Sequence, residues 1–152
     1  MSNNLKGKVA YITGGSKGIG FGVAKSLLDA GMNVAISSRS LSAAQEAAAT
    51  LHSDPNRILA IASDVSSMES ETHAVKAVMD HFGQLDVLVA NAGVGHFAPI
   101  DTLTEFQWAE TIDTNLTGVF HSVKACIDPL KLSEGYIITI ASLAGTNFFE
   151  SA

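Results

Sequence analysis

Glycine is concentrated in one short segment of this sequence, in a pattern typical of a phosphate-binding loop. The segment YITGGSKGIGFG, residues 11–22, holds five glycines in twelve positions, directly after an apolar run. Its spacing, Thr13-Gly14-x3-Gly18-x-Gly20, lets the backbone turn sharply and leaves free N–H groups where a helix begins. Such N–H groups, with the positive end of the helix dipole, bind phosphate. The alternative is a tight turn without a ligand. A P-loop is excluded, because no Gly-Lys-Ser/Thr follows at the required spacing.

Apolar runs and helical patterns alternate along the rest of the chain. Runs rich in β-branched residues predict buried strands at 9–13, 33–38, 58–63, 85–90 and 136–141. Four helices are predicted between them, three from apolar residues at helical spacing and the second, at 41–51, from a run of strong helix formers. The expected buried face of the first helix holds Ile19, Val23 and Leu27, with Ala24 and Leu28 beside them. That of the last holds Ile112, Leu116, Val119, Phe120, Val123, Ile127 and Leu130. Strands that are apolar throughout and alternate with helices indicate an α/β fold, a doubly wound parallel sheet in a single domain over residues 1–152.

Small and polar residues follow the predicted strands. Ligands of a doubly wound sheet bind beyond the carboxyl ends of the strands, so these residues are candidates for a site. Asp64 either accepts a hydrogen bond from the amino group of a base or caps the next turn. Asn91 braces the neighbouring backbone, while Ala92 and Gly93 leave room for a ligand. Ser142 either caps the end of the fifth strand or donates a hydrogen bond to a substrate oxygen.

Together these segments resemble the short-chain dehydrogenase/reductase family over essentially the whole chain. The similar motifs are TGGSKGIG at 13–20 (the family's cofactor loop), the pair Asp64-Val65 (its adenine contact), ANAG at 90–93 (its Asn-Asn-Ala-Gly, with Ala90 for the first asparagine), Asn115 and Ser142 (two of its catalytic residues). The resemblance implies a Rossmann fold with strand order 3-2-1-4-5. It also implies an oxidoreductase that interconverts a carbonyl and an alcohol, most similar to the ketoacyl-carrier-protein reductases.

The resemblance also assigns a nicotinamide cofactor and no metal. The implied cofactor-binding residues are Thr13, Gly14, Ser16, Lys17, Gly18, Ile19, Gly20, Ser38, Arg39, Asp64, Val65, Asn91, Ala92 and Gly93. A site that prefers NAD has an acidic residue after the second strand, whereas here Ser38 and Arg39 stand there. With Lys17, they offer two cations and a hydroxyl, which suit the 2′-phosphate of NADP(H). The alternative is that both cations are solvated surface groups.

Asn115 lies among apolar residues of the longest predicted helix, so we expect its amide to be buried and hydrogen-bonded. It is then either a structural bridge or part of a proton path, and the resemblance favours the second. In the family's reaction, Ser142 would polarise the carbonyl oxygen and Asn115 would hold a relay water.

The family's general acid/base, the tyrosine of a Tyr-x3-Lys motif beyond the serine, is not among these 152 residues. Neither Tyr11 nor Tyr136 is followed by a lysine four positions later. We therefore interpret the chain as the cofactor-binding part of a longer reductase, inactive by itself, without the family's C-terminal strands and helices. The fifth strand is accordingly expected to present a bare apolar edge. The alternative is a complete, non-catalytic nucleotide-binding or interaction module.

Charge and composition argue against several other partners. The net charge is −6, with only nine lysines and arginines, which disfavours nucleic acid and anionic membranes. No segment approaches the length of apolar chain that spans a bilayer. Cys126 is the only cysteine, which suits a reducing compartment. We expect a cytoplasmic protein with a small-molecule carbonyl or alcohol substrate, and a homo-oligomer when full length.

Overall fold

The computed structural model describes residues 5–145, and within them the chain forms one parallel sheet. Its strands are β1 (Val9–Ile12), β2 (Asn33–Ser38), β3 (Ile58–Ala62), β4 (Val87–Ala90) and β5 (Tyr136–Thr139). Their spatial order is β3-β2-β1-β4-β5, and every neighbouring pair is parallel. The doubly wound α/β fold predicted from the sequence, with strand order 3-2-1-4-5, is confirmed.

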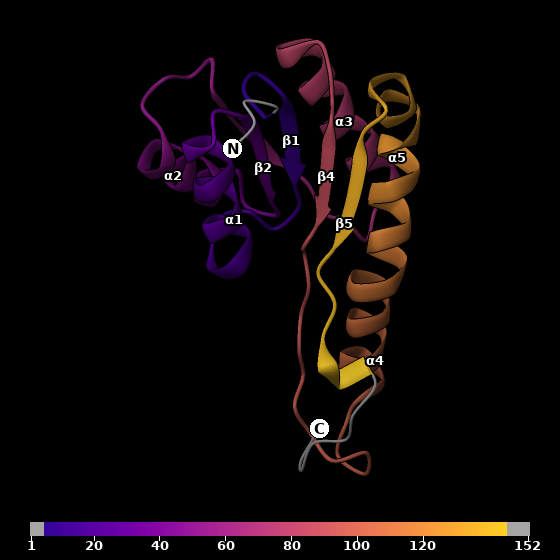
Figure 1. The fold of residues 1–152 in the computed structure, drawn as a ribbon. Coiled ribbons are helices and arrows are strands. Elements are labelled where there is room, and N and C mark those ends of the chain that lie inside the picture. Colours follow the sequence, from indigo (N-terminus) through magenta and orange to yellow (C-terminus); the bar gives the residue numbers. More distant parts are fainter. Residues whose placement is uncertain (1–4, 146–152) are drawn as a thin grey trace.

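Helices cover both faces of this sheet. They are α1 (Gly18–Asp29), α2 (Leu41–Leu51), α3 (Met68–Phe82), α4 (Glu105–Ile112) and α5 (Gly118–Ser133), with a π-helical segment at Asp113–Thr117 and a 3₁₀ turn at Leu143–Gly145. Helices α1 and α2 lie on one side, and α3 and α5 on the other (Figure 1). The chain between β4 and α5, which includes α4, extends beyond the carboxyl ends of the strands.

Local capping explains where several helices begin and end. Ser40 caps α2, its Oγ accepting from the Ala43 N–H at 3.3 Å. Thr104 and Gln107 form a reciprocal capping box at the start of α4. At the other end of a helix, Gly83 terminates α3 in the left-handed conformation, with φ of 76°.

The buried faces of α1 and α5 match the predicted ones in part, since Ala24, Leu28 and Leu130 are buried as expected. Helix α1 buries Gly20, Ala24 and Leu28, whereas Ile19 is 66% exposed. Helix α5 buries Gly118, Ser122, Cys126 and Leu130, whereas Leu116 and Phe120 stay mostly exposed. In both helices the face that packs begins with a glycine, because the backbone approaches its neighbours too closely for a side chain. A Cβ on Gly118, for example, would lie 2.6 Å from Val65 Cγ2.

The longest predicted helix is interrupted by one wide turn. Over Asp113–Thr117 the backbone is π-helical, and the Gly118 N–H donates to the Asp113 carbonyl, five residues back. Such turns are frequent at functional sites. This one contains Asn115, which is exposed rather than buried as expected.

A polar cluster lies inside the apolar core between β1, β2 and α3. The Glu71 carboxyl is fully buried, and its Oε1 lies 3.0 Å from the Tyr11 hydroxyl and 2.6 Å from Ser63 Oγ. The Tyr11 hydroxyl also lies 3.1 Å from Ser37 Oγ. Burial, and then the charge of Glu71, raise the pKa of Tyr11 well above its usual 10.0. The same two causes raise the pKa of the Cys126 thiol from 9.0.

We expect this cluster to weaken the fold at alkaline pH. Tyr11 has its raised pKa only in the folded protein, so its contribution to stability is complete below about pH 10 and is lost as the pH rises above that value. The urea concentration at the unfolding midpoint of the wild type should therefore be lower at about pH 11 than at about pH 8. In Tyr11→Phe this decrease in the urea midpoint should be smaller. The comparison is between the two decreases, so it does not depend on the variant's own midpoint at about pH 8. Equal decreases in the two proteins would show that Tyr11 does not titrate as inferred.

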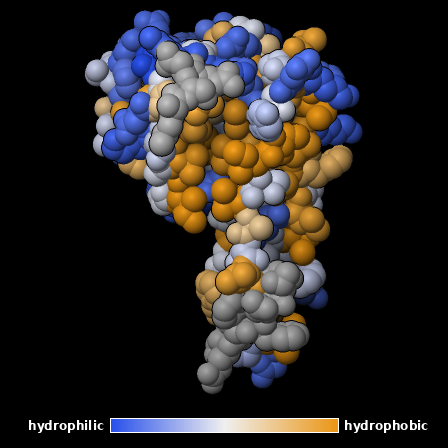
Figure 2. Space-filling view, viewed as in Figure 1, coloured by the Kyte–Doolittle hydropathy of each residue, from blue (hydrophilic) through white to orange (hydrophobic). Residues whose placement is uncertain are grey.

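Strand β5 presents the bare apolar edge that the sequence predicts. Among the described residues β5 pairs only with β4, and all four of its residues are exposed. Ile137, Ile138 and Ile140 are 38–48% exposed, and hydrophobic side chains gather over this part of the molecule in Figure 2. Within the described residues, no helix is long and apolar enough to cross a lipid bilayer.

Candidate cofactor-binding site

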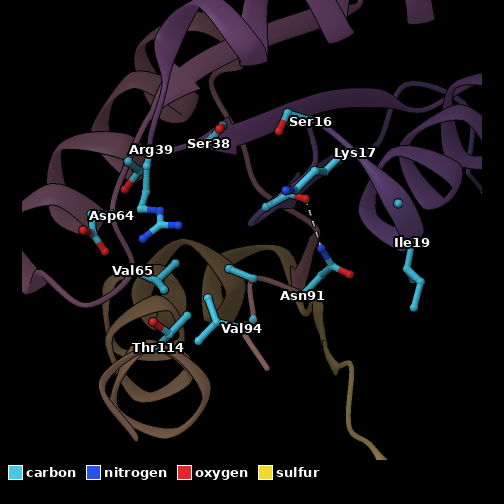
Figure 3. Close-up of a pocket in the computed structure, with 15 residues that line it drawn as sticks. Ser16, Lys17, Ile19, Ser38, Arg39, Asp64, Val65, Asn91, Val94 and Thr114 are labelled. Carbon is cyan, nitrogen blue, oxygen red and sulfur yellow. Dashed lines mark hydrogen bonds between the residues drawn. The ribbon is translucent and has the colours of Figure 1, made fainter. Parts of the chain in front are cut away.

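A pocket of about 460 Å³ lies at the carboxyl ends of β1, β2, β3 and β4, where the doubly wound fold binds ligands. Its lining residues are Gly14, Ser16, Lys17, Gly18, Ile19, Ser38, Arg39, Ser63, Asp64, Val65, Asn91, Ala92, Gly93, Val94 and Thr114. The structure therefore brings together twelve of the fourteen cofactor-binding residues predicted from the sequence. They come from four separate strand ends (Figure 3).

The glycine loop connects β1 to α1 and forms one wall of this pocket. Gly14 and Gly18 have φ of 65° and 59°, left-handed values that side chains rarely adopt. Within the described residues, the side chain of Lys17, the N-cap residue of α1, makes no capping hydrogen bond. Gly18 and Ile19, the first residues of α1, line the pocket, and in the described part of the chain no side-chain cap occupies the N–H groups of this first turn. A bound phosphate would satisfy them, so the loop fits the predicted chemistry.

Thr13 and Gly20 do not line the pocket but hold its wall in place. Thr13 Oγ1 accepts from the N–H groups of Asn91 and Ala92, both at 3.0 Å. Asn91 Nδ2 donates to the carbonyls of Thr13 at 2.9 Å and Gly14 at 3.2 Å. A Cβ on Gly20 would lie 2.5 Å from that same Nδ2. These contacts fix the end of β1 to the end of β4, so the Asn91 side chain braces the neighbouring backbone.

Two cations reach toward the pocket from different segments. Figure 3 shows Lys17, from the glycine loop, and Arg39, after β2, extending into the space between them, with Ser16 and Ser38 nearby. Arg39 Nη1 lies 3.5 Å from Oε1 of Glu110 in α4. The side chain of Arg39 is 66% exposed, so it can reorient toward a ligand.

Asp64 caps the turn that follows β3 while it also lines the pocket. Its Oδ1 accepts from the Ser66 N–H at 3.0 Å and from Ser66 Oγ at 2.7 Å. The capping role that the sequence left open is therefore real. Val65 beside it is held by His121, whose Nδ1 lies 2.9 Å from the Val65 carbonyl oxygen. Asp64 and Val65 thus form an ordered wall of the pocket opposite the glycine loop.

Asn115 acts on the loop that follows β4. Its Oδ1 accepts from the Val94 N–H, and its Nδ2 donates to the Val94 carbonyl, both at 2.8 Å. A Cβ on Gly93 would lie 3.3 Å from Asn115 Oδ1. The amide therefore bridges this turn to the loop after β4, which is one of the two roles that the sequence left open, although the residue is exposed.

Ser142 follows the carboxyl end of β5, beside the carboxyl end of β4. The Ile140 N–H donates to the Ala90 carbonyl at 3.0 Å, which aligns this segment with the start of the Asn91–Gly93 loop. Ser142 Oγ accepts from the Ala144 N–H at 3.2 Å, and the side chain is exposed. Ser142 does not line the pocket, but it follows the strand beside the one that carries Asn91.

Three lining residues were not predicted, namely Ser63, Val94 and Thr114. Each has a small side chain next to a predicted residue or near one, but no motif marks it. Ser63 joins the pocket to the buried cluster, since its Oγ bonds to Glu71. Within the described residues, no group of three or more His, Cys, Asp or Glu side chains could hold a metal ion.

Comparison with known proteins connects this geometry to a large group of enzymes. The sequence profile described as short chain dehydrogenase matches residues 8–152. The chain is 37% identical over 147 residues to a 3-oxoacyl-[acyl-carrier-protein] reductase FabG of Chlamydia trachomatis, covering 95% of this chain and 59% of that protein. It is 37% identical over 144 residues to the FabG of Vibrio cholerae, covering 94% and 58%. The chain thus spans somewhat more than half the length of these relatives.

Solved structures give the same picture. An alcohol dehydrogenase from Thermococcus sibiricus, complexed with 5-hydroxy-NADP, superposes with a TM-score of 0.89 at 35% identity, covering 95% of this chain and 62% of that one. A 3-ketoacyl-(acyl-carrier-protein) reductase from Brucella melitensis, complexed with NADH, superposes with a TM-score of 0.86 at 31% identity, covering 93% and 60%. Both relatives hold a nicotinamide dinucleotide.

Proposed function

Because the chain belongs to the short-chain dehydrogenase/reductase family, we propose that the protein it forms part of is an NADP(H)-dependent oxidoreductase that interconverts a carbonyl and an alcohol. The oxidoreductase class follows from the family. The choice of NADP(H), the reaction and the roles of individual residues form the proposal, since the chain spans 58–59% of the curated relatives described above.

The preference for NADP(H) rests on one observation, the presence of Lys17, Ser38 and Arg39 in a single pocket. Sites that prefer NAD place a carboxylate after β2 to bond the ribose hydroxyls. Here β2 ends in Ser38 and is followed by Arg39, whose planar guanidinium suits a phosphate. A phosphate on the adenosine ribose would compensate both cations.

The rest of the pocket offers a place for each part of the dinucleotide. The glycine loop and the first turn of α1 would hold the pyrophosphate. Asp64 and Val65 would flank the adenine, and the segment Asn91–Gly93 would flank the nicotinamide ribose. When bound, the cofactor supplies or accepts the hydride of the reaction. The nicotinamide dinucleotides present in two structural relatives support this assignment.

Ser142 and Asn115 would serve the chemistry at the open edge of the sheet. The Ser142 hydroxyl would donate a hydrogen bond to the carbonyl oxygen of the substrate and stabilise the charge that builds there. Asn115 would hold the water of a proton relay, as the resemblance implies, while its side chain keeps Val94 in place. The proton itself would come from the family's Tyr-x3-Lys motif, which these 152 residues do not contain.

Substrate class and assembly complete the proposal. Two of the relatives are named as 3-oxoacyl reductases, which makes a 3-oxoacyl thioester the first substrate to assay.

Large apolar side chains are exposed along α4 and the helical segments that continue it, among them Phe106, Trp108, Leu116 and Phe120. We propose that this segment packs against a second copy in a homo-oligomer. The single, buried cysteine suits a cytoplasmic location.

Reversing the charge at Arg39 tests the NADP(H) assignment. In Arg39→Asp, the 2′-phosphate loses a cation and meets an anion, so the affinity for NADPH should fall by about tenfold or more. The affinity for NADH should stay equal or rise, because the introduced carboxylate can bond the ribose hydroxyls. Fluorescence titration of both reduced cofactors measures these affinities.

A matched control separates local contact from net charge. Lys6→Asp makes the same change in charge at an exposed position before β1, at the amino-terminal end of that strand and so away from the pocket. It should leave both affinities within about twofold. If Arg39→Asp also leaves the NADPH affinity unchanged, Arg39 does not bind the 2′-phosphate.

A further inference from the structure

Arg39 already has an anionic partner in the structure, and that partner comes from a distant part of the chain. Glu110 lies in α4, 71 residues away, and its Oε1 is 3.5 Å from Arg39 Nη1. Both side chains line a second hollow of about 340 Å³. It shares Arg39, Asp64 and Thr114 with the cofactor pocket, so the ion pair stands at the border of that pocket.

Glu110 is held in place from its other side. His96, in the loop after β4, has Nε2 at 2.7 Å from Glu110 Oε2. A carboxylate only accepts hydrogen bonds, so Nε2 carries the proton and donates it. The side chains of His96 and Glu110 are about three-quarters buried, at 26% and 25% exposure, whereas that of Arg39 is 66% exposed. The carboxylate is therefore the fixed member of the pair, and the guanidinium is the one that can move.

We propose that Glu110 competes with the 2′-phosphate of NADP(H) for Arg39, and so limits how strongly the protein prefers NADP(H) over NAD(H). This inference rests on the proposed function, in which Arg39 binds that phosphate. A phosphate that takes Arg39 must displace the guanidinium from Glu110 or share it, and in either case part of the attraction between Arg39 and Glu110 is lost. NAD(H) carries no such phosphate, so its affinity does not depend on the pair.

The variant Glu110→Gln tests the competition, because it removes the charge and keeps the shape. The dissociation constant of NADPH should fall by about threefold to tenfold at low salt, the range for a partly exposed charge. That of NADH should stay within about twofold. The gain should shrink as salt is added, since the ions screen exposed charges. Glu105→Gln is the matched control, because it removes an exposed charge from the same helix and should change neither constant by more than about twofold.

A double-mutant cycle with Arg39→Gln tests separately whether Arg39 binds the 2′-phosphate and whether Glu110 competes for Arg39. Arg39→Gln should weaken NADPH binding, and adding Glu110→Gln to it should bring no further gain. If Arg39→Gln leaves NADPH binding unchanged, the 2′-phosphate site and the competition are both wrong. If Arg39→Gln weakens binding but Glu110→Gln leaves it unchanged or weakens it too, the proposed function stands and the competition is overturned. A gain that persists without Arg39 would also overturn the competition.

Discussion

Replacing Ser142 by alanine in the full-length protein is expected to lower kcat by about two to three orders of magnitude, the effect of losing one hydrogen bond to a developing oxyanion. Ser142 follows β5 at the edge of the sheet where β4 ends in the Asn91–Gly93 loop. Its hydroxyl is exposed there and available to a substrate oxygen. The dissociation constant of NADPH should hardly change, because Ser142 does not line the cofactor pocket. Reduction of a 3-oxoacyl thioester, followed by NADPH absorbance, measures kcat.

The control for this variant is a serine beside β3, the strand at the opposite end of the sheet from β5. Ser53 is exposed in the loop that precedes β3, so Ser53→Ala should leave kcat unchanged. Should Ser142→Ala keep kcat within about threefold of the wild type, its hydroxyl would only cap the turn through Ala144. The proposed role in catalysis would then be wrong.

Adding one methyl group at Gly20 is expected to disrupt the cofactor pocket although Gly20 does not line it. A Cβ there would lie 2.5 Å from Asn91 Nδ2 and 2.7 Å from the Gly14 carbonyl oxygen. The hydrogen bonds that join the end of β1 to the end of β4 would have to break or shift. Gly20→Ala should therefore lower the free energy of unfolding by about 2–4 kcal/mol. Urea denaturation measures this change.

Gly22→Ala is the matched control, two residues further along α1. Its Cβ would meet no atom of the described residues within 4 Å, and the position is exposed. Because alanine favours a helix interior over glycine, this variant should be more stable by up to about 1 kcal/mol. If the two variants had the same stability, the close contact at Gly20 would not matter to the fold.

The arrangement of the site could be predicted because parallel strands bring their carboxyl ends to one edge. Gly14, Arg39, Asp64 and Asn91 follow four different strands, and each lines the same pocket. The limits of helix α2, Leu41–Leu51, were also predicted, because strong helix formers fill that segment. Local chemistry and topology therefore determined most of the site.

Packing between elements could not be predicted in the same way. Apolar periodicity pointed to Ile19 as a buried residue of α1, but the helix turns Gly20 toward the sheet, because only a glycine fits the close approach to Asn91. The π-helical turn around Asn115 depends on a backbone hydrogen bond, from Gly118 to Asp113, that side-chain spacing does not reveal. The contact between Arg39 and Glu110 joins segments far apart in sequence, so no local pattern marks it.

Calorimetric titration of the unmutated protein with NADPH and with NADH tests the central claim most directly. If Lys17, Ser38 and Arg39 bind the 2′-phosphate, NADPH should bind at least about tenfold more tightly than NADH. Two equal dissociation constants, or tighter binding of NADH, would contradict the claim that this pocket is built for NADP(H).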